Sequence, residues 1–273
     1  NQQVSAISRY CYDALYRVTE SSGRENFRAN GAPQQFEDDP FQVQFPVGQP
    51  DALRNYTQTY DYDSAGNLQQ MRHVAVNQSW TRHYETALDS NRLARTWERD
   101  SINATRYRYD IHGNMLNLAN VAAEQSIRWD YRDMIRAFNM VGGGWAYYNY
   151  DIGKQRTRKV IENQNGAKQW ERIYLGGVEI YRRYSGGRVV EEIESLHLMA
   201  SDRVLLVDDV LQTDNTRLPT GTLYRYQYNN HLGSACVELN QRAEIISYEE
   251  YHPYGTTAYR ATNSDIEVPP KRY

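Results

Sequence analysis

A short pattern that recurs along the chain constrains its fold more than any other feature. Its clearest copy lies in TQTYDYDSAGNLQQMRH, residues 57–73. Tyr60 and Tyr62 lie two residues apart and project from the same face of an extended strand. Asp63 precedes a small-residue turn, where its carboxylate can accept hydrogen bonds from backbone N–H groups, and Gly66 reaches positive φ without steric cost. The stretch therefore predicts a β-hairpin.

The pattern returns at least four times, and a further copy uses Trp129 in place of tyrosine. The copies are YCYDALYRV at 10–18, YRYDIHGNML at 107–116, YNYDIGKQR at 148–156, YQYNNHLGS at 226–234 with Asn229 in place of aspartate, and WDYRDMI at 129–135. Their shortest interval, near 20 residues, fits one hairpin, so a sheet that grows by repetition is predicted. The residues expected to build the repeat are Tyr12, Asp13, Tyr62, Asp63, Gly66, Tyr109, Asp110, Gly113, Trp129, Asp130, Asp133, Tyr150, Asp151, Tyr228, Leu232 and Gly233.

The segments between these copies also predict strands and turns. Residues 80–97 alternate around TALDSN, and Gly176-Gly177 and Gly186-Gly187 separate strands at a ten-residue interval. Residues 28–56 and 212–222 lack periodicity and are expected to be irregular surface loops. The fold class is therefore all-β, with repeated antiparallel hairpins and no clear helix.

Composition limits the function classes. The 273 residues carry a formal charge of -3, so no basic field favours a nucleic-acid partner, and the short apolar runs predict no membrane span. Tyrosine is abundant, 24 residues against 5 Phe, as suits half-buried strands. The start NQQVSAISRYCYD has no initiator Met and no signal peptide, so a fragment of a longer chain is expected. Cys11 and Cys236 allow at most one disulfide.

No catalytic, cofactor or metal site is predicted. The aspartates recur once per hairpin, which favours turn capping over acid-base catalysis. The histidines have no metal-site spacing, although a folded sheet can bring distant ones together; they are His73, His83, His112, His197, His231 and His252. VGGGW at 141–145 lacks the Lys-Ser/Thr of a phosphate loop and is interpreted as a hairpin turn. Asp208 and Asp209 are not expected to bind one ligand together, because side chains of neighbouring residues on a strand point to opposite faces of the sheet.

The unit Y-D-x-x-G-[NR]-[LMV], present as YDSAGNL and YDIHGNM, resembles the tyrosine-aspartate or RHS repeat. The later series YDIGKQRTRKV, YLGGVEIYRRY, YNNHLGSACVELN and ISYEEYHPYGTTAY is similar to the stretch that leads into the RHS-associated core of bacterial insecticidal toxin-complex (ABC-type) C components. Teneurin shells are a more distant likeness. Lys154 departs from the pattern, since the repeat usually has glycine there. We expect one RHS/YD-repeat region over residues 1–273, with the start of the core-like region at 223–273.

The resemblance implies a function as well as a fold. In that family the repeats spiral into a hollow shell that holds a C-terminal toxic effector, which a self-cleavage element releases. It implies a non-enzymatic segment of a secreted bacterial toxin, with the cleavage element and effector beyond Tyr273. The implied partners are the rest of the shell, a companion toxin-complex subunit and the enclosed effector, without a cofactor. The alternatives are a carbohydrate-binding or adhesion module, in which Trp80, Trp97, Trp129 and Tyr147 would stack on sugars, and a hydrolase.

Overall fold

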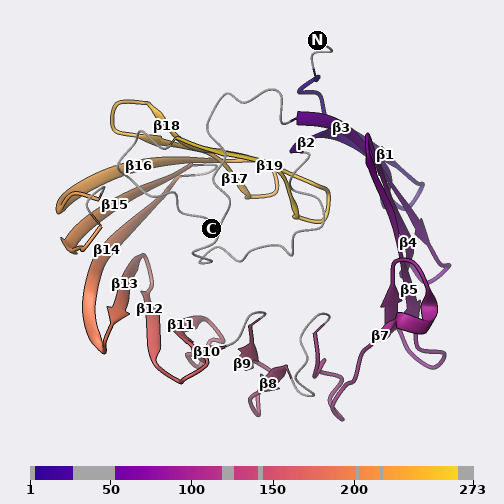
Figure 1. Cartoon of the computed structure of the whole chain (residues 1–273), viewed down its shortest axis with the longest axis horizontal. Coiled ribbons are helices and arrows are strands. Elements are labelled where there is room, and N and C mark those ends of the chain that lie inside the picture. The colour runs from indigo at the N-terminus through magenta and orange to yellow at the C-terminus, as the bar shows by residue number, and fades with distance from the viewer. Residues whose placement is uncertain are drawn as a thin grey trace.

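Consecutive antiparallel hairpins make up nearly all of the described chain in a computed structural model (Figure 1). The structure describes residues 4–26, 53–118, 126–140, 144–200, 203–215 and 218–263. Strand order follows the sequence throughout, in a seven-stranded sheet from β1 to β7 and a twelve-stranded sheet from β8 to β19. The all-β prediction, with hairpins repeated along one chain, is confirmed.

The seven-stranded sheet contains β1 (Arg9–Tyr12), β2 (Val18–Asn26), β3 (Leu53–Tyr62), β4 (Leu68–Ala75), β5 (Gln78–Thr86), β6 (Leu93–Trp97) and β7 (Thr105–Arg106). The twelve-stranded sheet contains β8 (Ile127–Trp129), β9 (Ile135–Asn139), β10 (Trp145–Tyr150), β11 (Arg156–Glu162), β12 (Lys168–Leu175), β13 (Val178–Ser185), β14 (Arg188–Ala200), β15 (Arg203–Gln212), β16 (Gly221–Asn229), β17 (Ala235–Asn240), β18 (Ile245–Tyr251) and β19 (Thr257–Thr262). All strand pairs are antiparallel.

The two sheets are joined by irregular pairing rather than separated. The Leu116 amide donates to the Arg108 carbonyl oxygen at 2.8 Å, and the Ile127 amide donates to the Leu116 carbonyl oxygen at 3.0 Å. Figure 1 shows the strands following one another around an arc whose two ends meet where β19 lies beside β2. A curved wall results, and among the described residues no backbone ladder joins β2 to β19.

Turn chemistry explains the hairpins that connect the longer strands. Leu175 pairs with Val178 across Gly176-Gly177, and Ser185 pairs with Arg188 across Gly186-Gly187, as predicted. Gly176, Gly186 and Gly187 all have positive φ, which glycine adopts without a Cβ clash.

Three predicted boundaries need correction. Residues 53–56, expected to belong to an irregular segment at 28–56, begin β3 and pair with β2, while 27–52 lie outside the described residues. Gln212, Gly221 and Thr222, expected in the second loop, belong to β15 and β16 because cross-strand pairing overrides their weak strand propensity. A short 3-10 helix, η2 (Ser101–Asn103), is the helical element among the described residues, and Asp100 caps it.

Burial on the twelve-stranded sheet combines apolar and charged side chains. One apolar cluster centres on Ala146, Ile161 and Trp170, and a second on Ile193, Val210 and Leu218. Further along the same sheet, Arg225 and Asp208 form an ion pair at 2.6 Å with both side chains almost fully buried. Buried charges of this kind are tolerated only when paired.

Asp208 is fully buried, whereas its neighbour Asp209 is exposed and accepts a hydrogen bond from Thr222. This agrees with their predicted opposite orientation. Cys11 and Cys236 are both free thiols. No helix in the described part of the chain is long and apolar enough to cross a membrane.

Candidate functional site

The repeat is built on one five-residue turn. In each copy the backbone amide of the first residue donates to the carbonyl oxygen of the fifth residue. The backbone amide of the fourth residue donates to the carbonyl oxygen of the first residue. The fourth residue has positive φ in every copy. The turns begin at Asp13, Asp63, Asp110, Asp130, Asp151, Asn163, Asn230, Asn240 and His252.

The aspartate side chain caps the turn from within. The Oδ1 atom of Asp63 accepts hydrogen bonds from the backbone amides of Ala65 at 2.9 Å and Asn67 at 2.8 Å. Its Oδ2 atom accepts from the Asn67 side-chain amide at 2.8 Å. Asp110 makes the same three contacts, with His112 and Asn114 as partners. Because ionised carboxylates only accept hydrogen bonds, they suit a loop whose amides point inward.

These hydrogen bonds favour the ionised form of the carboxylates. The side-chain and backbone donors of Asn67 lower the pKa of Asp63 below its usual value. For Asp13, the Arg17 backbone amide is the largest influence and the pKa is again lowered. For Asp110, burial acts to raise the pKa, but the hydrogen bonds from Asn114 outweigh it and the pKa is lowered. Asp13, Asp63 and Asp110 are therefore charged near neutral pH.

The sequence pattern missed the turns at Asn163, Asn240 and His252, and it found the turn within 226–234 but placed its first residue one position early. Asn229 was expected to stand for the aspartate, but Asn230 does so, because the Leu232 and Ser234 amides donate to its Oδ1. Gly233 then falls at the positive-φ position, and Tyr228 lies two residues ahead of the turn. A search for Asn followed by Gly three residues later would have found the turns at Asn163 and Asn230.

At five of the turns, the aromatic residue directly ahead connects neighbouring hairpins through a hydrogen bond. The Tyr62 hydroxyl donates to the Val18 carbonyl oxygen at 2.8 Å, and Trp129 Nε1 donates to the Met115 carbonyl oxygen at 2.8 Å. Tyr109, Tyr150 and Tyr251 make equivalent bonds to Leu93, Ile135 and Ala235. The sequence placed these aromatic residues on one face of a strand, but it did not predict a side-chain donor that reaches the preceding hairpin.

Polar side chains also connect successive turns along the rim of the sheet. Arg17 Nη1 donates to the Asp63 carbonyl oxygen at 3.3 Å, and its guanidinium lies 4.9 Å from the centre of the Tyr62 ring. Asn114 donates to Asp133 Oδ1 at 2.8 Å. Arg132 donates to the Asp151 carbonyl oxygen at 2.8 Å. At these three places, successive repeats are thus tied together by side chains.

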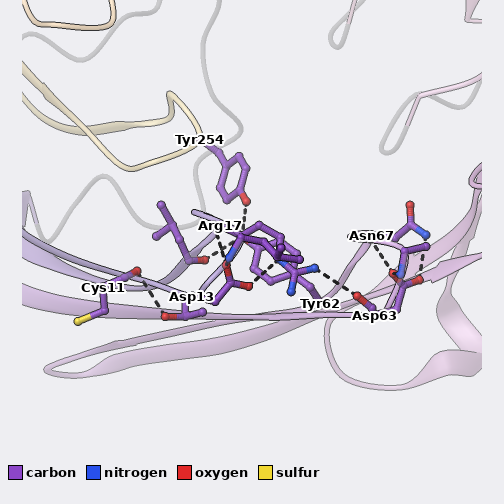
Figure 2. A network of polar contacts seen from close by, with 11 residues as sticks. Cys11, Asp13, Arg17, Tyr62, Asp63, Asn67 and Tyr254 are labelled. Atoms are coloured by element: carbon purple, nitrogen blue, oxygen red, sulfur yellow. Dashed lines mark hydrogen bonds and ion pairs between the residues drawn. The ribbon is translucent and has the colours of Figure 1, made fainter.

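The two ends of the arc meet at a seam, where the turn after β18 contacts β2 and β3. Figure 2 shows Tyr254 extending from that turn toward Tyr62, and their hydroxyl oxygens lie 2.5 Å apart. The Tyr254 ring meets Tyr60 edge-on at 5.3 Å. Arg24 of β2 forms an ion pair with Glu250 of β18 at 2.5 Å. Among the strands that the structure describes, side chains rather than a backbone ladder hold this seam.

A buried polar cluster lies at the centre of the seam. Glu25 accepts hydrogen bonds from Arg54 at 2.8 Å, from His73 at 3.1 Å and from His252 at 3.2 Å. Glu25 and His73 are fully buried. Burial acts to raise the pKa of Glu25, but the hydrogen bonds from His252, His73 and Arg54 outweigh it and lower the pKa to about 2. The cluster unites residues that no sequence spacing could connect.

The other candidate rings are occupied by neighbouring side chains. Trp80 stacks on His73 at 5.2 Å, and Trp97 stacks on His83 at the same distance. Trp145 lies 4.1 Å from the Arg128 guanidinium carbon, and Tyr147 lies beside it. In VGGGW, residues 141–143 lie outside the described residues, and β9 and β10 pair on either side of them.

Comparison with known proteins identifies relatives. The chain is 30% identical to the toxin subunit YenC1 of Yersinia entomophaga over 285 aligned residues, and 31% identical to YenC2 of the same organism over 280. These alignments cover 100% and 98% of the chain but only 28% of each relative. No protein-family model matches the chain.

Solved structures share the fold. A crystal structure of TcdB2-TccC3 without its hypervariable C-terminal region superposes with a TM-score of 0.77 at 25% identity, covering 97% of this chain and 13% of that one. The Photorhabdus luminescens Tc holotoxin pore gives a TM-score of 0.77 at 24% identity, covering 97% of this chain and 12% of that one, and this likeness concerns the fold alone. The resemblance to toxin-complex C components that the repeat motifs indicated is confirmed.

Proposed function

Because the chain is homologous to the Yersinia entomophaga toxin subunits YenC1 and YenC2, we propose that it is a wall segment of a secreted bacterial toxin, whose complete shell encloses a C-terminal effector before delivery. The observation that carries the proposal is the run of antiparallel hairpins in sequence order through two sheets, in which aromatic donors and rim side chains reinforce the backbone pairing of several hairpins. Such a wall is rigid across its width, which containment requires.

The partners proposed are the remaining shell and a companion toxin-complex subunit. The chain spans about a quarter of the curated relatives, so enclosure belongs to a larger protein than the 273 residues. Support for a companion comes from structures whose names pair TcdB2 with TccC3. The role of this segment in that assembly is to hold its curvature.

Glycan recognition is the rival function, and the ring contacts disfavour it. A sugar-stacking site needs an accessible aromatic face, whereas the candidate rings Trp80 and Trp97 stack on His73 and His83, and Trp129 donates Nε1 to the Met115 carbonyl oxygen. Turn capping and packing account for the same residues without a ligand.

Co-purification separates the two functions. The protein that contains this chain is expressed with and without its companion toxin subunit and analysed by size-exclusion chromatography, and the same protein is applied to a glycan array. A wall component elutes with the companion as one stable complex and shows no saturable glycan binding. Saturable binding of one glycan class, without a complex, would replace containment by adhesion.

A further inference from the structure

Three side chains with metal-ligating atoms converge at the seam. They are Glu25 on β2, His73 on β4 and His252 immediately after β18. Their ligand atoms all lie within 4.8 Å of one another, and both imidazoles direct Nε2 at the Glu25 carboxylate. All three side chains are buried. Two neutral imidazoles and one carboxylate form the donor set that zinc takes in many proteins.

The far nitrogen of each imidazole is held by a further side chain. His73 Nδ1 lies 3.2 Å from the Gln58 amide nitrogen, and His252 Nδ1 lies 2.9 Å from Thr256 Oγ1. Histidines that bind metals donate a hydrogen bond through the far nitrogen, which directs the other nitrogen at the ion; Thr256 Oγ1 can accept such a bond, whereas the Gln58 amide nitrogen donates in this structure. The ring of His73 is fixed further by Trp80, which stacks on it.

We propose that Glu25, His73 and His252 bind one divalent transition-metal ion of the zinc class, which clamps the two ends of the arc at the seam. His73 Nε2 lies 3.1 Å from Glu25 Oε1 and His252 Nε2 lies 3.2 Å from Glu25 Oε2, so the carboxylate presents one oxygen to each imidazole. Because the ligand atoms of the three side chains lie within 4.8 Å of one another, one ion between them is within reach of all three. Small rotations of the two imidazole rings direct both Nε2 atoms at the ion. Solvent supplies the fourth ligand.

Proton positions can adapt to the ion without a net change. In each neutral imidazole the proton moves from Nε2, which then binds the metal, to Nδ1. Thr256 accepts that hydrogen bond by rotating its hydroxyl. Gln58 accepts it when its side-chain amide turns over, and the Tyr60 hydroxyl, which lies 2.5 Å from the Gln58 amide oxygen, then accepts from the amide nitrogen.

The positive charge of Arg54 weakens metal binding at this cluster, so a substitution of Arg54 can show whether the ion binds there. Its Nε donates to Glu25 at 2.8 Å, and its Nη1 donates to the Val76 carbonyl oxygen at 2.7 Å. A fixed positive charge at this distance lowers the affinity for a cation. Removing it should tighten metal binding at this cluster and leave binding at any other histidine unchanged.

The test titrates the chelator-treated protein with Co²⁺ and then Zn²⁺, following visible absorption and calorimetry. Wild type should bind one equivalent, with the absorption of a low-coordinate Co²⁺ ion that Zn²⁺ abolishes. His73→Gln and His252→Gln should bind at least tenfold more weakly. His83→Gln, whose ring stacks on Trp97 away from the cluster, is the matched control and should bind as wild type. Arg54→Met should bind severalfold more tightly.

Absence of stoichiometric Zn²⁺ binding by wild type would overturn the proposal. So would equal affinity in His252→Gln, or an affinity unchanged by Arg54→Met, because the ion would then lie elsewhere. If His73→Gln fails to fold, His252→Gln decides, since His252 lies in a turn outside the strands. The test involves neither an effector nor a companion subunit, so its result is independent of the proposed function.

Discussion

The hydroxyl of Tyr62 donates to the carbonyl oxygen of Val18, which lies 44 residues earlier in the chain and one hairpin away in space. Burial raises the pKa of Tyr62, and the contact with the Tyr254 hydroxyl raises it further, so the group stays a neutral donor. The same bond recurs from hairpin to hairpin, and Tyr251 makes it to Ala235. The aromatic residue of the repeat therefore fastens one hairpin to its predecessor.

Replacing this donor should weaken the wall. Tyr62→Phe keeps the ring but leaves the Val18 carbonyl oxygen and the Tyr254 hydroxyl without their partner, so we expect a loss of about 1–2 kcal/mol in the free energy of unfolding. Tyr131→Phe is the control, because Tyr131 is 89% exposed. Chemical denaturation measures both, and equal stability of the two variants would show that the ring alone matters.

The capping role of the aspartates predicts a graded response. Asp63→Ala removes acceptors for the Ala65 and Asn67 amides and should lower the melting temperature. Asp63→Asn should lower it less, because Asn163 and Asn230 cap equivalent turns through Oδ1. Thermal unfolding of the pair gives the answer. Identical melting of Asp63→Ala and wild type would refute capping.

Backbone strain at the fourth turn position predicts opposite effects for two substitutions. Ala243 has φ 61° and carries a Cβ in the left-handed region, so Ala243→Gly should stabilise the protein by about 0.5–1 kcal/mol. Gly166 has φ 76° with nothing within 4 Å of an added Cβ, so Gly166→Ala should cost about 1 kcal/mol through the backbone alone. The urea concentration at the midpoint of unfolding should rise for Ala243→Gly and fall for Gly166→Ala. A change in the same direction for both variants would contradict backbone strain at this position.

Glu25 predicts how stability depends on pH. Its pKa falls from 4.5 to about 2 in the folded chain, so its contribution is fully present above pH 4.5 and is lost as the pH falls toward 2. The contribution is about 3 kcal/mol at neutral pH. Glu25→Gln cannot ionise, so its free energy of unfolding should fall less steeply between pH 5 and 2.5. If the free energy of unfolding changed with pH equally in wild type and Glu25→Gln, the ionisation of Glu25 would not contribute to the pH dependence.

The hairpins could be predicted because they depend on contacts between residues close in sequence. The seam could not be predicted because it depends on contacts between residues far apart in sequence. Tyr62, Asp63 and Gly66 act within a few residues of one another, so their order alone indicates a turn. Asn230 was displaced by one residue in the sequence interpretation because Asn229 matched the pattern equally well. His252 caps a turn without resembling aspartate, and it meets Glu25 across 227 residues of sequence. Only the curvature accumulated over all the strands brings those two side chains together.

Protease protection of the effector tests the central claim most directly. The longer protein that contains this chain, assembled with the companion subunit proposed for it, is digested alongside the proposed effector in isolation, and the effector fragment is followed by mass spectrometry. Containment predicts that the enclosed effector survives while the isolated one is degraded, and that protection ends when the wall is unfolded by denaturant. Degradation of both effectors at the same rate, with the hairpin wall still folded, would contradict containment.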